Sequence, residues 1–181
     1  MPKPTIRLLE TKDFEQLHEL YSERDAYSNT LQLPYQSVEQ WQSTMARSGH
    51  TSLVAVRGDE LLGQISIDLH SSLRRRHVAS IGMGVKASAR AQGVGTALVR
   101  AAIDLCESWT NISRIELEVY TDNHAGIALY KKCGFVLEGT CRRYAYRDGA
   151  FVDVHMMARI KGETEARRPH DHHPRESVRD P

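Results

Sequence analysis

With 181 residues, 40% of them apolar, the chain can bury one hydrophobic core and is short for two, so we expect one domain. A formal net charge of only +1 argues against nonspecific binding to nucleic acid and favours a small neutral or anionic partner. The three cysteines have no C-x-x-C spacing, which favours a reducing cytoplasm. The sequence has no apolar run near the roughly 20 residues that span a bilayer and no apolar N-terminal signal, so we expect no membrane segment.

The first third of the chain predicts a strand and two helices. Residues 5–10 form the strand, and Thr11 is a candidate N-cap for the first helix. Ser37 and Gln40 form a capping-box pattern at the start of the second helix. The irregular segment at residues 26–35 lies between the two helices, and its composition predicts a loop.

Alternating apolar residues then predict strands. SLVAV and LLGQISIDL, joined by a turn at Gly58 and Asp59, indicate an antiparallel hairpin, and residues 77–86 form a further strand. The next helix has apolar residues at helical spacing, and its predicted buried stripe is Val94, Leu98, Ala101 and Leu105.

RIELEVY is the next strand, followed by a short helix at residues 123–133 that Asp122 or Asn123 caps and Gly134 ends. A final hairpin turns at Asp148 and Gly149. Together these elements predict an α/β (α+β) fold with a mixed, mostly antiparallel, twisted sheet of about six to seven strands and about four helices.

The composition changes after residue 161, so we predict one domain over residues 1–161 and a disordered polar tail over residues 162–181. His170, His172 and His173 lie in this tail. Ordering a flexible segment around an ion costs entropy, so we predict no metal site there.

The segment ASIGMGVKASARAQGVGTAL carries the clearest chemical signal. A strand leads through a polar loop to Gly93 and Gly95, which open a helix. Glycine permits close approach to the main chain, and a helix N-terminus offers unpaired N–H groups and a partial positive charge. This arrangement predicts a pyrophosphate site.

Two other phosphate loops fail on detail. A nucleoside-triphosphate loop needs Lys and then Ser or Thr after its last glycine, whereas Thr96 and Ala97 follow Gly95. A dinucleotide fingerprint needs a third glycine where Leu98 stands, and it begins directly at the strand end, whereas residues 86–92 intervene here.

Arg90, Gly93 and Gly95 match the R/Q-x-x-G-x-G/A signature, and the chain is similar to the GNAT N-acetyltransferase superfamily. LEVYTDNHAGIALYKKCGF resembles that superfamily's second cofactor segment, and the likeness covers roughly residues 5–161. The resemblance implies strands splayed around acetyl-CoA (coenzyme A) and transfer of its acetyl group to an amine. The residues that it assigns to the cofactor are Met83, Val85, Arg90, Gln92, Gly93, Val94, Gly95, Thr96 and Asn123.

The resemblance also assigns Tyr130 as the acid that protonates the departing thiolate. Seven helical residues turn about 700°, so Asn123 and Tyr130 share one face. A phenol with a pKa near 10 is protonated at pH 7 and can supply a thiolate whose pKa is roughly 8.5. Glu118, on the same strand face as Glu116, is the candidate base, and a solvated or structural carboxylate is the alternative.

The resemblance places the acceptor pocket between the loop after the first helix and the last hairpin, which implies Tyr27, Asn29, Tyr35, Tyr144 and Tyr146. NTLQLP, RRRHVA and YKKCGF resemble bacterial L-amino-acid N-acyltransferases. Protein N-terminal and polyamine acetyltransferases remain alternatives, as does a sensor that binds acetyl-CoA without turnover. The family implies a small-molecule amine as partner and is compatible with a homodimer.

Amine basicity favours an α-amine acceptor over a polyamine. An α-amine with a pKa near 7.7 to 8.0 is about a tenth neutral at pH 7, whereas a lysine-like amine near 10.4 is less than about a thousandth neutral. Asp148 and Asp153 are the acidic residues that could favour a polyamine instead. A basic run, Arg74, Arg75 and Arg76, precedes the strand at residues 77–86. The loop with Gly93 and Gly95, called the glycine loop, follows the other end of that strand, so we predict a solvated hairpin tip at the basic run.

Overall fold

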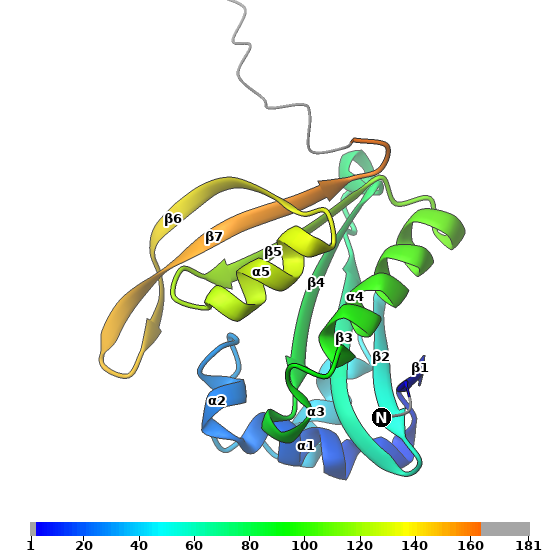
Figure 1. Cartoon of the computed structure of the whole chain (residues 1–181), viewed down its shortest axis with the longest axis vertical. Helices are drawn as coiled ribbons and strands as arrows, with labels where there is room; N and C mark the ends of the chain where they lie inside the picture. The colour runs from blue at the N-terminus through cyan, green and yellow to red at the C-terminus, as the bar shows by residue number, and fades with distance from the viewer. Residues whose placement is uncertain (1–2, 164–181) are drawn as a thin grey trace, which may run out of the picture.

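The computed structural model describes residues 3–163 and contains one seven-stranded sheet in the order β1-β2-β3-β4-β5-β7-β6 (Figure 1). The strands are β1 Thr5–Leu8, β2 His50–Arg57, β3 Glu60–Leu69, β4 Val78–Val85, β5 Arg114–Tyr120, β6 Val136–Arg147 and β7 Ala150–Ile160. Among these strands β4 and β5 pair in parallel, and the other neighbours are antiparallel. The predicted mixed, mostly antiparallel sheet is confirmed.

Five α helices accompany the sheet in the described range. They are α1 Phe14–Ser22, α2 Arg24–Tyr27, α3 Val38–Met45, α4 Val94–Asp104 and α5 His124–Lys132. Shorter turns of other helix types are η1 Thr11–Asp13, η2 Leu73–Arg75, η3 Ala87–Ala89 and η4 Leu105–Trp109. The additional helix is α2, which overlaps the start of the predicted loop. None of the helices described is long and apolar enough to cross a membrane.

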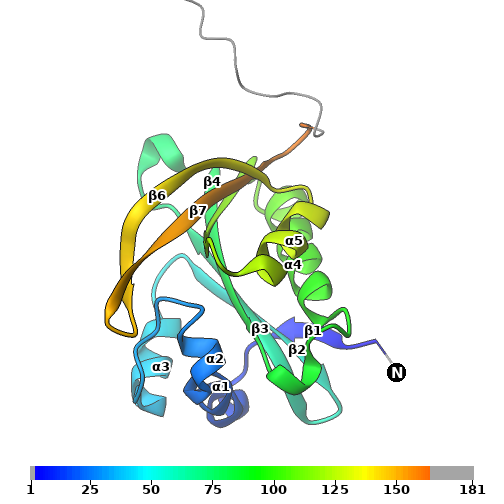
Figure 2. The same ribbon diagram turned by 60° about the vertical axis from the view of Figure 1, so that its left-hand side comes forward.

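The helices cover both faces of the sheet: α4 and α5 lie on one side, and α1 to α3 on the other (Figures 1 and 2). Under α4, Leu98 belongs to a core with Ile65 and Leu117. Under α1, Leu20 belongs to a second core with Val54. Because side chains alternate across a strand, Ile65 faces α4 while its neighbour Gln64 faces the α1 side.

Local signals in the sequence set several ends and turns. The Ser37 hydroxyl accepts the Gln40 amide (3.3 Å), and the Gln40 side chain accepts the Ser37 amide (2.8 Å), as the capping box predicts. Asp148 and Gly149 have φ of +50° and +81°, values typical of a tight hairpin turn. Gly134 ends α5 with φ of +85°.

The β4–β5 pairing opens into a V. The two strands pair only from Val78 to Ser80, against Arg114 to Glu116. The β3–β4 register runs without a shift, so β4 is splayed from β5 and is not bulged toward β3. On the β3 side, the His70 amide donates to the Val78 carbonyl (3.3 Å), and the Lys86 amide donates to the Leu62 carbonyl (2.9 Å). By alternation, the backbone groups of odd-numbered β4 residues point toward the open V.

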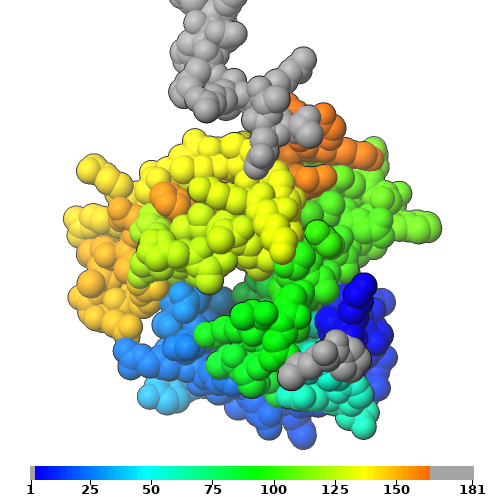
Figure 3. All heavy atoms as spheres, viewed as in Figure 1, coloured from blue at the N-terminus to red at the C-terminus, as the bar shows by residue number. Residues whose placement is uncertain are grey.

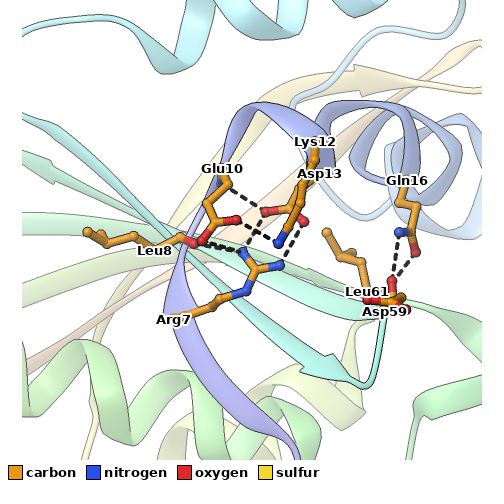
Figure 4. A network of polar contacts seen from close by, with 8 residues as sticks. All are labelled: Arg7, Leu8, Glu10, Lys12, Asp13, Gln16, Asp59 and Leu61. Atoms are coloured by element: carbon orange, nitrogen blue, oxygen red, sulfur yellow. Dashed lines mark hydrogen bonds and ion pairs between the residues drawn. The ribbon is translucent and has the colours of Figure 1, made fainter.

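The predicted Thr11 cap is wrong, because the chain first makes the turn η1 with Glu10 as its N-cap. The Asp13 carboxylate accepts the Glu10 amide (2.8 Å) and two hydrogen bonds from the Arg7 guanidinium (2.6 and 2.8 Å; Figure 4). Beside this network, Gln16 accepts the Leu61 amide (2.8 Å; Figure 4). These contacts join β1, α1 and the β2–β3 turn.

The Arg7–Asp13 pair gives a stability prediction. Asp13 is 3% exposed, and hydrogen bonds from Arg7 hold the pKa of its carboxyl below the ordinary value of 3.8. Asp13→Ala removes the acceptor of the Arg7 guanidinium and of the Glu10 amide, so it should lower the free energy of unfolding at pH 7 by about 2 kcal/mol. The pair's contribution is present above about pH 4 and is lost as the pH falls through the lowered pKa.

Urea unfolding at several pH values measures this effect, with Lys12→Ala as the control. Lys12 and Glu10 form an exposed ion pair (2.8 Å), which should contribute less than about 1 kcal/mol. The prediction is contradicted if both variants lose the same free energy of unfolding. It is also contradicted if the difference in that free energy between Asp13→Ala and wild type does not shrink in acid.

The last strand ends at Ile160, close to the predicted boundary of the domain. Residues 164–181, with His170, His172 and His173, lie outside the described residues. The disordered tail over residues 162–181 therefore stays a prediction.

Candidate active site

A cavity of about 830 Å³ lies where β4 and β5 separate. The glycine loop and α5 line one part of it, and α1 to α3, β3 and β5 line the other. Figure 3 shows the surface hollowed between the β6–β7 hairpin and α5 above and α2 below. One continuous cavity therefore joins the predicted cofactor residues to the predicted acceptor region.

The N-terminus of α4 opens into this cavity. Gly93 is the N-cap residue, with φ of +82°, and no side chain caps the helix. The amide of Ala97 bonds the Gly93 carbonyl (3.0 Å), so the amides of Val94 to Thr96 precede the first helical hydrogen bond. A Cβ added to Gly93 would have no heavy atom within 4 Å. The loop thus presents free amides beside open space.

Gly95 is a glycine for a different reason. A Cβ there would lie 3.0 Å from Cδ2 of Leu129 on α5 and 3.3 Å from Cε of Met83. The sequence interpretation gave both glycines one role, close approach of an anion. In the structure Gly95 lets α4 and α5 pack closely, and Gly93 provides the left-handed backbone.

Arg90 and Gln92 brace the loop. The Arg90 guanidinium donates to the Asp25 carboxylate (3.1 Å) and to the Val85 carbonyl (3.3 Å), and Arg90 lines the cavity. The Gln92 side chain donates to the Ser88 carbonyl (2.7 Å) and is not part of the cavity lining. The predicted cofactor contact of Gln92 therefore stays a prediction, and its side chain supports the loop.

Asn123 and Tyr130 both line the cavity, in agreement with the shared face expected from their spacing. The Asn123 side chain accepts the Gly126 amide (2.9 Å) and caps α5. Tyr130 is 8% exposed and packs edge-on against Phe135. Burial raises the pKa of the Tyr130 hydroxyl above its ordinary value of 10.0, and Cys133 adds to this effect. The phenol is therefore protonated at any pH where the protein would work.

The two β5 carboxylates differ in their partners. Although burial acts to raise it, hydrogen bonds from Arg114 (2.9 Å) and Arg75 (2.6 Å) hold the pKa of Glu116 below its usual value. Arg75 thus has an internal partner at the predicted hairpin tip. Glu118 lines the cavity and has no ion-pair partner among residues 3–163. Burial and the Glu118 carboxylate raise the pKa of nearby Tyr144.

Of the five predicted acceptor residues, Asn29 and Tyr144 line the cavity, and Tyr27, Tyr35 and Tyr146 do not. Tyr35 is fully exposed. Tyr146 lies two residues closer to the hairpin tip than Tyr144 and packs against Phe151. Tyr27 ends α2, whose Asp25 and Ala26 face the cavity instead.

The sequence interpretation missed a polar row on β3. Gln64, Ser66 and Asp68 line the cavity, and their period-two spacing in QISID was the available signal. The Gln64 amide donates to Ser66 (2.9 Å) and accepts the hydroxyl of Tyr21 (2.7 Å). Asp68 lies 2.7 Å from Nδ1 of His50.

The tip of the β6–β7 hairpin closes on α2. Arg24 donates to Asp148 (2.9 Å), and Arg147 donates to the carbonyl of Ser28 (3.3 Å) just after α2. Asp153 accepts the amide of Arg143 (2.8 Å). Asp148 and Asp153, the residues that could favour a polyamine, therefore make structural contacts and do not line the cavity.

Comparison with known proteins identifies the class. Residues 14–135 match the acetyltransferase (GNAT) family. The chain is 41% identical over 162 residues to L-amino acid N-acetyltransferase AaaT of Escherichia coli (strain K12), covering 89% of this chain and all of that protein. Spermidine N(1)-acetyltransferase of Vibrio cholerae is 25% identical, over 84% of this chain and 90% of that protein.

Solved structures share the fold. Ribosomal-protein-alanine N-acetyltransferase from Brucella melitensis has a TM-score of 0.76 at 26% identity, covering 86% of this chain and 99% of that one. Spermidine N-acetyltransferase from Vibrio cholerae, in complex with CoA and spermine, has a TM-score of 0.79 at 22% identity, covering 87% and 95%. The chain belongs to the acetyltransferase (GNAT) family. It is an N-acetyltransferase, as the sequence predicted.

Proposed function

We propose that the protein transfers the acetyl group of acetyl-CoA to the α-amine of a free amino acid in a ternary complex. The observation that carries this proposal is the single cavity shared by the free amides of α4 and the Glu118 carboxylate. The amino-acid specificity rests on the likeness to the Escherichia coli enzyme, which acts on L-amino acids by its name. The lower basicity of α-amines supports an amino acid over a polyamine.

The residues present fit acetyl-CoA. The free amides of Val94 to Thr96 would hold its pyrophosphate, because helix N-termini bind anions. On β4, Met83 and Val85 have backbone groups that point toward the V and would pair with the pantetheine arm. Asn123 keeps its amide nitrogen for the cofactor while its oxygen caps α5.

Acetyl-CoA supplies an acyl thioester that a neutral amine can attack at the carbonyl carbon. Glu118 would accept the proton that the ammonium group loses, directly or through water. Tyr130, which its raised pKa keeps protonated, would donate its hydroxyl proton to the departing thiolate and take up in turn, directly or through water, the second proton that the attacking nitrogen loses. The amide bond forms as the thioester bond breaks. Glu118 acts on the attacking amine, and Tyr130 acts on the departing thiolate.

A panel assay tests the proposal. We expect thiol release from acetyl-CoA with L-amino acids and much less with spermidine or an N-terminal alanine peptide. If only polyamines or only peptides are acetylated, the proposed amino-acid acceptor is wrong and that amine takes its place. No thiol release with any amine, despite cofactor binding, would indicate a sensor.

Glu118→Gln gives a separate prediction. We expect kcat/KM for an amino acid to fall about 100-fold at pH 7, since general-base catalysis contributes about 10²- to 10⁴-fold. The neutral fraction of the amine rises with pH, so the deficit should shrink between pH 7 and pH 9. A pH–rate profile of both proteins measures this. A deficit that is constant with pH would assign Glu118 to binding only.

The wider proposal is that residues 1–161 form the catalytic unit and that the protein is a cytoplasmic homodimer without a nucleic-acid partner. The apolar Val136 and Leu137, 44% and 46% exposed on edge strand β6, support contact with a second copy. Sedimentation velocity measures the oligomeric state.

A further inference from the structure

Two glycines on β4, Gly82 and Gly84, face the same side of the sheet for different reasons. A Cβ on Gly84 would lie 3.0 Å from Cδ2 of Leu20 and 3.0 Å from the ring of Tyr21, so packing requires glycine there. A Cβ on Gly82 would meet no heavy atom within 4 Å. Gly82 also lies in regular strand, outside the positive-φ region. Nothing in the protein's own packing requires glycine at residue 82.

The open space over Gly82 belongs to the cavity. Ser66 is the partner of Gly82 on β3. On the other side, the β4–β5 pairing ends at Ser80 and Glu116, so Gly82 and Glu118 follow two residues later on the same face. Ser66 is therefore next to the bare backbone of Gly82, and Glu118 lies across the V on the same face and lines the same cavity.

The side chains of Ser66 and Glu118 suit a primary ammonium group. Ser66 accepts one hydrogen bond from Gln64 (2.9 Å), which leaves acceptor capacity on its hydroxyl oxygen. Gln64 is 1% exposed and is also bonded to Ser52 (2.6 Å) and Tyr21 (2.7 Å), so this support is fixed. Glu118 supplies negative charge. An amine between them would place its α-carbon over Gly82.

We infer that the space over Gly82 is the subsite for the reacting amine and the α-carbon of the acceptor. The subsite admits an α-branched primary amine such as an L-amino acid, because residue 82 has no side chain. This inference rests on the proposed function and names the residue that sets the acceptor's allowed branching.

The test compares Gly82→Ala with wild type on glycine, which has no α-substituent, and on a panel of L-amino acids. A single methyl group in a fitted pocket changes kcat/KM by about 10- to 200-fold. We expect at least a tenfold loss on L-amino acids and a smaller loss on glycine. The affinity for acetyl-CoA and the melting temperature should hold, because alanine suits a strand better than glycine does.

Gly84→Ala is the matched control. It should lower the melting temperature, because its Cβ displaces Tyr21 or Leu20. If wild type acetylates L-amino acids and Gly82→Ala keeps the same ratio between them and glycine, the subsite is wrong and the proposed function stands. If wild type acetylates only unbranched amines, both are wrong.

Discussion

Tyr130→Phe should lower kcat about 100-fold or more while the dissociation constant for acetyl-CoA stays within about threefold, because positioned acids contribute about 10²- to 10⁴-fold. Phenylalanine keeps the buried ring and its edge-on contact with Phe135. Within residues 3–163 the Tyr130 hydroxyl has no hydrogen-bond partner, so its removal leaves no other group unsatisfied. The expected loss is therefore chemical and not structural.

Steady-state kinetics and calorimetric titration of acetyl-CoA measure the two quantities. Tyr120→Phe is the control, because Tyr120 also lines the cavity but donates to the carbonyl of Thr30. With the pKa of Tyr130 raised by burial, wild type should show no loss of activity from this group up to about pH 10. Equal kcat in Tyr130→Phe and wild type would remove the tyrosine from the mechanism.

The parts of the fold that the sequence predicts are those with local causes. The Ser37–Gln40 box and the Asp148–Gly149 turn each depend on residues a few positions apart, so their signals are complete in a short window. The glycine loop is local in the same sense. The predicted Thr11 cap of the first helix is wrong, because Asp13 bonds to Arg7 on β1 and the chain makes a separate turn before the helix.

The acceptor end depends on contacts between distant segments. Arg24 and Asp148 are 124 residues apart, and their contact joins the hairpin tip to α2. On the same hairpin strand Tyr144 lines the cavity and Tyr146 does not. Composition and spacing contain no information on such a contact, so the list of predicted tyrosines could not be sorted in advance.

The roles of Gly93 and Gly95 also depend on packing contacts that the sequence does not contain. Gly93 and Gly95 look alike in the sequence, and only the packing of Leu129 against Gly95 separates their roles. The polar row of Gln64 and Ser66 differs, because its period-two spacing was visible.

Gly93→Val should raise the dissociation constant for acetyl-CoA about 100-fold. A hydrogen bond to a charged group contributes about 1.5 to 3 kcal/mol, and a branched side chain at the N-cap should remove one or two such bonds to the pyrophosphate. Valine also disfavours φ of +82°, which costs stability as well. Loss of affinity must therefore be separated from loss of fold.

Gly149 provides that separation. It has φ of +81°, no heavy atom within 4 Å of an added Cβ, and no place in the cavity lining, so Gly149→Val imposes the same backbone strain elsewhere. Calorimetric titration and thermal melting of both variants should show similar losses of melting temperature, with weakened acetyl-CoA binding confined to Gly93→Val. If both variants lose affinity equally, the effect comes from the fold. If neither does, the cofactor's pyrophosphate does not bind at the start of α4, because a valine at Gly93 would project into the open space beside those amides.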